Sequence, residues 1–215
     1  MNLNNIKGKK TFSTETIKRL SLYLRNLKRI RDSGINIISS DQISQFLEAT
    51  PVQFRKDLSY FGGFGKRGVG YNVERLIKEI ESILGVNKEW KIAMVGLGKL
   101  GTALLGFDGF SKFNIKIVYV FDSSTDKTEN VKKGIKIEHI SNMKEVIKKN
   151  SIKIAIISTP PDVAQHTANE LVAAGITGVL NFAPILLKVP DHVSVSNVDM
   201  ACELESLIFF ATKKN

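Results

Sequence analysis

The stretch WKIAMVGLGKLG, residues 90–101, decides the fold of the larger part of this 215-residue chain. Residues 90–95 form an apolar run of strand length, and a helical pattern starts at Leu100, so a glycine turn joins a strand to a helix. The next apolar run ends in Asp122, 21 residues after Gly101. A glycine pattern alone is weak evidence, but in this setting it predicts a dinucleotide-binding α/β unit.

Each glycine of the turn has its own expected role. Gly96 permits the tight turn, Gly98 lets the backbone approach a pyrophosphate, and Gly101 lets helix and strand pack closely. The helix N-terminus adds N–H donors and a positive dipole end. Asp122 is expected to accept hydrogen bonds from the adenine ribose. Its charge would repel a 2′-phosphate and residues 123–124 supply no arginine, so NAD(H) is favoured over NADP(H). A turn without a ligand is the alternative interpretation.

The chain after this turn alternates between strand-like and helical segments. Such alternation predicts a parallel sheet with helices on both faces. The β-type runs occupy residues 115–121, 152–158, 178–182 and 193–198, and the helical patterns occupy residues 142–149 and 162–174.

The net charge of +10 is concentrated in the first part of the chain. Residues 1–85 hold 15 Lys and Arg against 8 Asp and Glu, a net charge of +7, whereas the remaining 130 residues hold 16 against 13, a net charge of +3. A nucleic-acid surface has this electrostatic pattern, and so does a solvated basic face. Composition alone leaves both interpretations open.

Four helices are predicted in this basic part. Residues 14–31 carry apolar side chains three or four positions apart with basic residues between them, which indicates an amphipathic helix. Residues 39–41 offer N-caps for a short second helix. The fourth helix is capped by Asn72 and closed by Gly85, which leaves residues 86–90 as the linker.

The third helix has the pattern of a helix that reads DNA. Thr50 is its expected N-cap and Pro51 its first residue. Phe54, Leu58 and Phe61 fall on one face and are expected in the core. The outer face, which we expect to meet the major groove or its flanking phosphates, carries Gln53, Lys56, Ser59 and Tyr60, with Arg55 near the boundary.

The next segment, residues 62–71, is too rich in glycine for a helix and is short enough for a β-hairpin with Lys66 and Arg67 at its tip. Two helices joined by a tight turn and followed by such a wing predict a winged-helix domain. We expect the wing to enter the minor groove, with Arg67 as its specificity contact in a narrow A·T-rich stretch. The alternative is that these cations serve only solubility.

The last segment, residues 199–211, is apolar around nearly its whole circumference, which predicts a buried helix. It either packs on its own sheet or inserts into a second subunit. We favour insertion, because a winged-helix protein that reads a palindrome needs a dimer. The predicted domains are therefore residues 1–85, 86–198 and 199–215.

Several other classes of protein are disfavoured. No stretch has the apolar length of a membrane span or the pattern of a secretion signal, so a cytoplasmic protein is expected. Cys202 is the single cysteine and is expected to be buried, and no metal-ligand spacing is present. His139, His166 and His192 are expected at the surface, without a partnered acid. We therefore expect no catalytic residue and no metal.

The chain resembles the Rex family of redox-sensing transcriptional repressors from about Thr16 to Phe210. The matching segments are residues 18–20 and 23–25, the stretch FRKDLSYFG at 54–62, GKRGVGY at 65–71, VGLGKLG at 95–101, NFAP at 181–184, and Val198 with Asp199. The order and number of these matches make chance agreement implausible.

The resemblance implies a homodimer in which NADH binding closes the two subunits and releases palindromic operator DNA, while NAD⁺ competes and permits DNA binding. It implies that the last helix is swapped between subunits near the partner's nicotinamide pocket. Together with the glycine turn it gives these expected cofactor contacts: Gly96, Leu97, Gly98, Lys99, Leu100, Gly101, Phe107, Asp122, Thr159, Pro160, Asn181, Phe182, Pro184 and Met200.

The resemblance also implies a switch, a salt bridge between Asp199 and Arg25 of the other subunit that exists in one state only. A tyrosine hydroxyl near the nicotinamide supports that state in the family, and here Phe107 takes its position, so the state preference is expected to be weaker. Lys99 is a second departure, since the family often has asparagine there, and it adds a cation near the pyrophosphate.

Two alternatives stay open: a small NAD-dependent oxidoreductase with an accessory basic domain, and a DNA-bridging protein with a purely structural Rossmann unit.

Overall fold

The computed structural model describes residues 12–65, 68–124 and 134–213. The chain divides into two compact units, Met1–Lys88 and Glu89–Asn215. Among the described residues, no helix combines the length and apolar character needed to cross a membrane.

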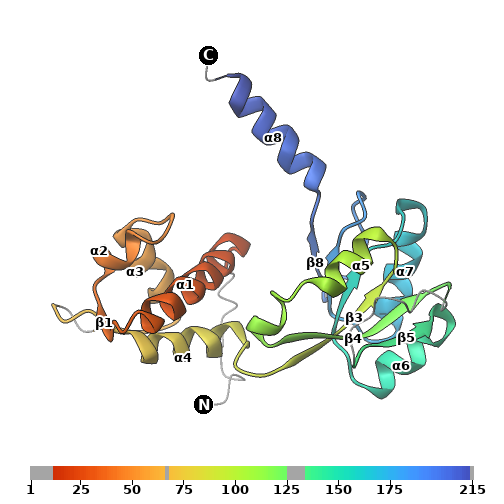
Figure 1. The fold of residues 1–215 in the computed structure, drawn as a ribbon, viewed down its shortest axis with the longest axis horizontal. Coiled ribbons are helices and arrows are strands. Elements are labelled where there is room, and N and C mark those ends of the chain that lie inside the picture. The colour runs from red at the N-terminus through yellow and green to blue at the C-terminus, as the bar shows by residue number, and fades with distance from the viewer. Residues whose placement is uncertain (1–11, 66–67, 125–133, 214–215) are drawn as a thin grey trace. The chain divides into compact units, whose positions relative to one another are not determined.

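The first unit is mainly helical (Figure 1). Its core lies among all four helices, where Leu20, Ile43, Phe54 and Ile80 are fully buried. Its elements are α1 (Thr14–Asp32), β1 (Ile37–Ile38), α2 (Ser40–Ser44), α3 (Pro51–Ser59), β2 (Tyr71–Asn72) and α4 (Val73–Leu84).

The helix ends lie where the capping residues predict. Ser39 and Gln42 form a reciprocal capping box at α2. The side chains of Thr50 and Asn72 accept backbone N–H bonds at the starts of α3 and α4. Gly85 ends α4 with a left-handed φ of 68°.

The predicted hairpin over residues 62–71 is wrong for the residues that the structure describes. Tyr71–Asn72 pairs instead with Ile37–Ile38, in the loop before α2. Gly62 and Gly68 have φ values of 143° and 79°, and such positive values interrupt the extended backbone that a strand requires. Lys66 and Arg67, the expected tip, lie outside the described residues.

The second unit is a six-stranded parallel sheet with the order β5-β4-β3-β6-β7-β8, which confirms the predicted architecture. The order reverses between β3 and β6, where α/β sheets bind ligands at the carboxyl ends of the strands. The elements are β3 (Trp90–Val95), α5 (Lys99–Gly106), η2 (Ser111–Phe113), β4 (Ile115–Asp122), β5 (Lys136–His139), η3 (Ile140–Asn142), α6 (Met143–Lys149), β6 (Ile154–Ile157), α7 (Pro161–Ala173), β7 (Gly178–Asn181) and β8 (Ser194–Asn197).

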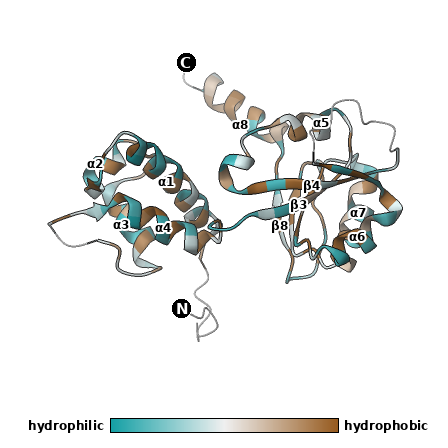
Figure 2. Cartoon of the chain, turned by 60° about the horizontal axis from the view of Figure 1, so that its bottom comes forward, coloured by the Kyte–Doolittle hydropathy of each residue, from teal (hydrophilic) through white to brown (hydrophobic). Residues whose placement is uncertain are grey.

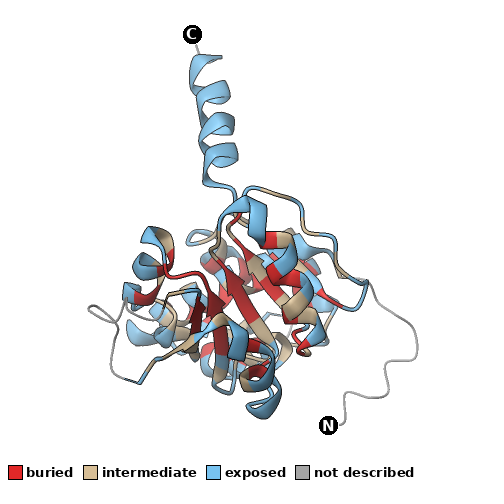
Figure 3. Cartoon of the chain, turned by 90° about the vertical axis from the view of Figure 1, so that its right-hand side faces the viewer, coloured by how far each residue is buried: buried red, intermediate tan, exposed pale blue. Residues whose placement is uncertain are grey.

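Helices cover both faces of this sheet. Successive residues of β3 point to opposite faces, so Ala93 and Val95 join the core under α6 and α7, while Met94 joins the core under α5. The central strands are accordingly buried on both sides (Figure 3). This packing holds the glycine turn after β3 in a fixed position.

The last helix, α8 (Met200–Thr212), has no buried residue (Figure 3). It does not pack on the sheet of its own chain, although it is largely apolar (Figure 2). Leu207 is 64% exposed and Phe209 is 56% exposed. Cys202 is exposed as well, so its predicted burial is wrong within one chain because the whole helix is uncovered.

Candidate functional site

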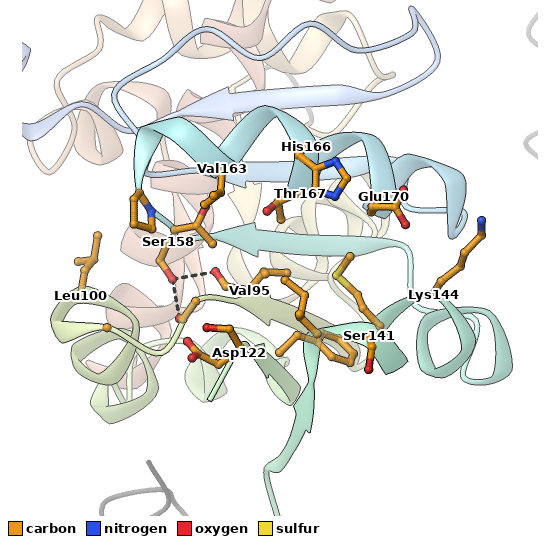
Figure 4. Close-up of a pocket in the computed structure, with 18 of the residues that line it drawn as sticks. Val95, Leu100, Asp122, Ser141, Lys144, Ser158, Val163, His166, Thr167 and Glu170 are labelled. Carbon is orange, nitrogen blue, oxygen red and sulfur yellow. Dashed lines mark hydrogen bonds between the residues drawn. The ribbon is translucent and has the colours of Figure 1, made fainter. Parts of the chain in front are cut away.

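A cavity of about 730 Å³ opens at the carboxyl ends of β3, β4 and β6 (Figure 4). This size lies within the range of small-molecule and cofactor sites. Of the predicted cofactor contacts, those that line it are Gly96, Gly98, Lys99, Leu100, Asp122, Thr159 and Pro160. The strand order and the glycine turn thus bring residues from three separate segments of the chain to one cavity.

Packing explains two of the three glycines of the turn, Gly96 and Gly101. Gly96 has φ +100°, and a side chain there would lie 2.7 Å from the Ser158 carbonyl oxygen. A Cβ at Gly101 would collide with the Gly96 carbonyl oxygen, so close packing of helix on turn requires glycine. A Cβ at Gly98, by contrast, would meet none of the described residues within 4 Å, which leaves space for a ligand at the start of α5.

Asp122 fixes the same turn from the end of β4. It is only 8% exposed, and its Oδ2 accepts the Leu97 backbone N–H at 2.6 Å. Its Oδ1 accepts the Ser124 backbone N–H at 3.0 Å. The carboxylate is therefore held beside the cavity and also ties β4 to the glycine turn. Leu97 itself is buried and does not line the cavity.

Ser158 and Thr159 form the wall that β6 contributes. The Ser158 hydroxyl donates to the carbonyl oxygens of Val95 and Gly96, at 3.1 and 2.9 Å (Figure 4). Thr159 Oγ1 is a buried side-chain polar atom for which the described residues offer no hydrogen-bond partner. A buried hydroxyl without a partner is costly, and a polar ligand in the cavity would relieve that cost.

The cavity extends beyond the predicted residues to Ser141, Lys144, His166 and Glu170 (Figure 4). His166 is exposed, as predicted, yet it faces this cavity. Sequence reasoning missed these four because they follow β5 or lie on α7, and only the sheet order brings them opposite Asp122. For Ser141 and Lys144, a predicted strand at residues 136–139 would have been the signal.

The other predicted cofactor contacts do not line the cavity in this chain. Asn181 is fully buried, and its side chain bonds to backbone groups of Ala183 and Ile185. Phe182 packs against the core under α5, and Pro184 lies in the loop after β7. Phe107 and Met200 are each 58% exposed.

Among the described residues predicted to contact DNA, four lie on α3 in the first unit and Tyr60 is its C-cap. Arg55, Lys56, Ser59 and Tyr60 are exposed and Gln53 is half-buried, while Phe54 and Leu58 are in the core. Arg55 Nη1 donates to Ser40 Oγ at 2.5 Å, which links α3 to α2. The described residues of the helix therefore present the polar face that the sequence predicts.

A buried carboxylate on α3 was missed. Asp57 is 0% exposed and accepts hydrogen bonds from Arg19 Nε at 2.6 Å and from Arg19 Nη2 at 2.8 Å. Tyr23 Oη and Gln53 Nε2 each donate to it at 2.8 Å. Burial acts to raise the pKa of Asp57, but the hydrogen bonds from Arg19, Tyr23 and Gln53 outweigh it and hold the pKa below its usual value. Burial, followed by the bond to Asp57, raises the pKa of Tyr23.

The predicted switch residues lie in different units. Asp199 is the N-cap of α8, and its Oδ1 accepts the backbone N–H groups of Ala201 and Cys202 at 3.0 and 3.1 Å. Arg25 is an exposed residue of α1. No group of three or more potential metal ligands occurs among the described residues.

Two family models match the chain. "CoA binding domain" matches residues 87–185, and "Putative DNA-binding protein N-terminus" matches residues 12–59. The first covers the glycine turn and the cavity, and the second covers α1 to α3.

Curated relatives match nearly the whole chain. The redox-sensing transcriptional repressor Rex of Syntrophobacter fumaroxidans is 43% identical over 90% of this chain and 93% of its own length. The protein of that name from Carboxydothermus hydrogenoformans is 44% identical over 90% of this chain and 93% of its own.

Solved structures agree with these relatives. RSP in complex with beta-NAD⁺ and operator DNA aligns with a TM-score of 0.89 and 34% identity, over 96% of this chain and 95% of that chain. RSP in complex with beta-NADH aligns with a TM-score of 0.83 and 33% identity, over 96% and 97%. The chain belongs to the Rex family of redox-sensing transcriptional repressors.

Proposed function

We propose that this protein is a transcriptional repressor that binds palindromic operator DNA and is released from it when NADH binds, so that it responds to the NADH/NAD⁺ ratio. One observation carries the proposal: the same chain has an NAD-type glycine turn beside a buried acid and a capped helix with a polar outer face. Relatives of the whole chain were solved with beta-NAD⁺ and operator DNA and with beta-NADH.

The residues around the cavity fit a dinucleotide. The open space at Gly98 and the N–H groups at the start of α5 suit a pyrophosphate. Asp122 suits the ribose hydroxyls of NAD(H) and opposes the 2′-phosphate of NADP(H). The Thr159 hydroxyl has no hydrogen-bond partner among the described residues, so it can bond to the cofactor. Lys99, which lines the cavity at the start of α5, adds positive charge for the phosphates.

The remaining predicted contacts are proposed to lie at the nicotinamide end of the site, to which we expect a second subunit to contribute its last helix. We propose a homodimer in which α8 is exchanged, since thirteen residues of largely apolar helix are uncovered in one chain. In the dimer, Phe107, Asn181, Phe182, Pro184 and Met200 would border the nicotinamide end of the site. Asp199 would pair with Arg25 of the other subunit in one state only.

The domains would be residues 1–85, 86–198 and 199–215. The protein would act in the cytoplasm, where operator DNA and the NAD(H) pool meet.

On the DNA side, α3 would enter the major groove with Gln53, Arg55, Lys56, Ser59 and Tyr60. Lys66 and Arg67 would contact the adjacent minor groove. Arginine and lysine bind phosphates irrespective of sequence, whereas the planar amide and guanidinium groups can read base edges. We propose no catalytic activity, and sustained oxidation of NADH by any carbonyl substrate would favour the oxidoreductase alternative instead.

The test is a titration of fluorescent operator DNA bound to the protein. NADH should release the DNA, whereas NADPH at the same concentration should not. Retention of the operator at saturating NADH would contradict the proposal.

A pair of variants tests whether NADH binds in the cavity. Asp122→Ala should weaken NADH binding at least tenfold, because it removes both a ribose acceptor and the bond that holds the turn. Asp191→Ala, which removes an exposed carboxylate outside the cavity, is the matched control. Equal NADH affinities for the two variants would remove Asp122 from the site.

A further inference from the structure

Gln53 is held at both its backbone and its side chain. Its backbone N–H donates to Thr50 Oγ1, the N-cap of α3, at 3.1 Å. Its side-chain Nε2 donates to Asp57 Oδ1, one helical turn further along, at 2.8 Å. A surface glutamine would otherwise sample several rotamers, so both contacts restrict how this amide is presented.

Asp57 is itself fixed by α1. Its Oδ2 accepts from Arg19 Nε and Tyr23 Oη, and its Oδ1 accepts from Arg19 Nη2 and Gln53 Nε2. A carboxylate offers about four acceptor positions, and these four donors use them. Arg19 Nη2 also contacts Thr16 Oγ1 at 3.2 Å. The anchor of Gln53 is therefore a rigid, charge-neutralised cluster within the first unit.

The anchor also decides which way the Gln53 amide points. An ionised carboxylate only accepts hydrogen bonds, so the nitrogen of the amide must face Asp57. None of the described residues donates a hydrogen bond to Gln53 Oε1. Among these residues, Thr159 Oγ1 is the buried side-chain polar atom without a partner, so Gln53 Oε1 must reach solvent. What remains for a partner is one acceptor and one N–H donor, side by side.

We propose that Asp57 is a positioning residue for operator recognition, which orients Gln53 so that its amide presents an acceptor and a donor to the adenine of an A·T pair. The adenine edge in the major groove offers the N6 donor and the N7 acceptor that match this pair. Guanine offers two acceptors there and would not match. This inference rests on the proposed function, because it assigns a reading role to one residue of the DNA-binding helix.

The Asp57→Asn variant tests the orientation. Two donors, Arg19 Nε and Tyr23 Oη, should keep the asparagine oxygen on their side. Its NH₂ group then faces Gln53 and also Arg19 Nη2, which loses its acceptor. Gln53 should then rotate its amide, accept from that NH₂ and present its own NH₂ outward. Operators in which each base pair is replaced symmetrically in both half-sites are measured by fluorescence anisotropy. In the wild type, replacing the base pair at one A·T position should lower operator affinity about 10-fold or more. The Gln53→Ala variant should show no such loss at that position.

Asp57→Asn should abolish the loss of affinity at that same position or turn it into a preference for G·C. The losses of affinity at the other positions should remain. The double variant should resemble Gln53→Ala at that position. Tyr23→Phe is the matched control, because it removes a donor to Oδ2 and spares the Gln53 bond to Oδ1. A uniform loss of affinity across all operators and random DNA in Asp57→Asn would overturn the proposal and indicate a structural role only.

A second measurement needs neither DNA nor a folded Asp57→Asn variant. The side-chain amide of Gln53 in the DNA-free wild-type protein should show NMR order parameters close to those of the backbone, whereas exposed Gln45 should be mobile. Equal mobility of the two glutamines would overturn the proposal. If the wild type binds no operator, the proposed function fails and the reading role of Gln53 fails with it. A rigid Gln53 side chain would in that case still show that Asp57 anchors it.

Discussion

At the scale of single residues, two buried carboxylates fix the geometry of the two sites. Asp57 joins α3 to α1 through side chains, and Asp122 joins β4 to the glycine turn through backbone N–H groups. The sequence predicts Asp122 because it ends a strand at a known distance from the glycines. It does not predict Asp57, because helical periodicity assigns a charged residue to solvent unless its partners are known, and Arg19 lies 38 positions away.

The Asp57 cluster should make the first unit sensitive to acid. A carboxyl group whose pKa is lowered on folding stabilises the native state above its unfolded pKa, about 3.9, and this contribution is lost as pH falls through the folded value. Protection of the α1 and α3 amides from hydrogen exchange should therefore decrease below about pH 4. The decrease should be smaller in Asp57→Asn, which has no such proton to bind. Parallel pH profiles of the two proteins would contradict this.

Gly101 should be intolerant of any side chain. A Cβ there meets the Gly96 carbonyl oxygen, which is backbone and cannot move without opening the turn. Gly101→Ala should destabilise the second unit by about 1–3 kcal/mol and weaken NADH binding. Gly106→Ala, in the same helix with nothing within 4 Å, should be neutral or stabilising by up to about 1 kcal/mol. Thermal unfolding checks both, and equal melting temperatures would count against the packing role.

At the scale of elements, local signals predict more than long-range ones. Ser39, Thr50 and Asn72 cap the helices α2, α3 and α4 as expected, because a cap is a contact within three residues. The strand β5 was missed, since its residues are half-buried or exposed and its short run at the edge of the sheet resembles a loop. The glycine-rich segment was wrongly predicted as a hairpin, because Tyr71–Asn72 pairs with a distant segment.

The uncovered helix α8 should be the element that holds the dimer together. Leu207 and Phe210 are each more than 60% exposed in one chain. Replacing both with glutamate would remove the burial of two large apolar side chains in each subunit, four in the dimer, about 6–12 kcal/mol. The dimer dissociation constant should therefore rise by more than about 10⁴-fold.

Sedimentation at micromolar concentration checks this prediction. Glu205→Gln, on the same exposed helix, is the control and should remain dimeric. A double variant that sediments as the wild type does would show that another surface forms the dimer. The sequence predicts an apolar helix here but cannot say which chain covers it, because hydrophobic periodicity carries no information about the partner.

At the scale of the whole molecule, the response depends on how strongly NADH prefers the state that does not bind DNA. Moving a two-state equilibrium from 1:99 to 99:1 requires a preference of about 5.5 kcal/mol. Binding energy that is equal in both states contributes nothing to that shift. A contact made in one state only, such as the proposed pair of Asp199 and Arg25, is therefore more important for the response than the total affinity of the cavity.

Phe107 is the position at which this preference should be adjustable. Its ring is 58% exposed and packs edge-on against Phe110, with the ring centroids 5.1 Å apart. Phe107→Tyr would add a hydroxyl at the position where the family resemblance implies one that supports the NADH state. A hydrogen bond worth about 0.5–1.5 kcal/mol should lower the NADH concentration for half-release of the operator roughly 2- to 10-fold. Phe110→Tyr adds the same hydroxyl to the neighbouring ring and should leave the release curve unchanged. If the two variants give the same NADH titration, the weaker preference does not originate at Phe107, and the closing contact must be sought along α8 instead.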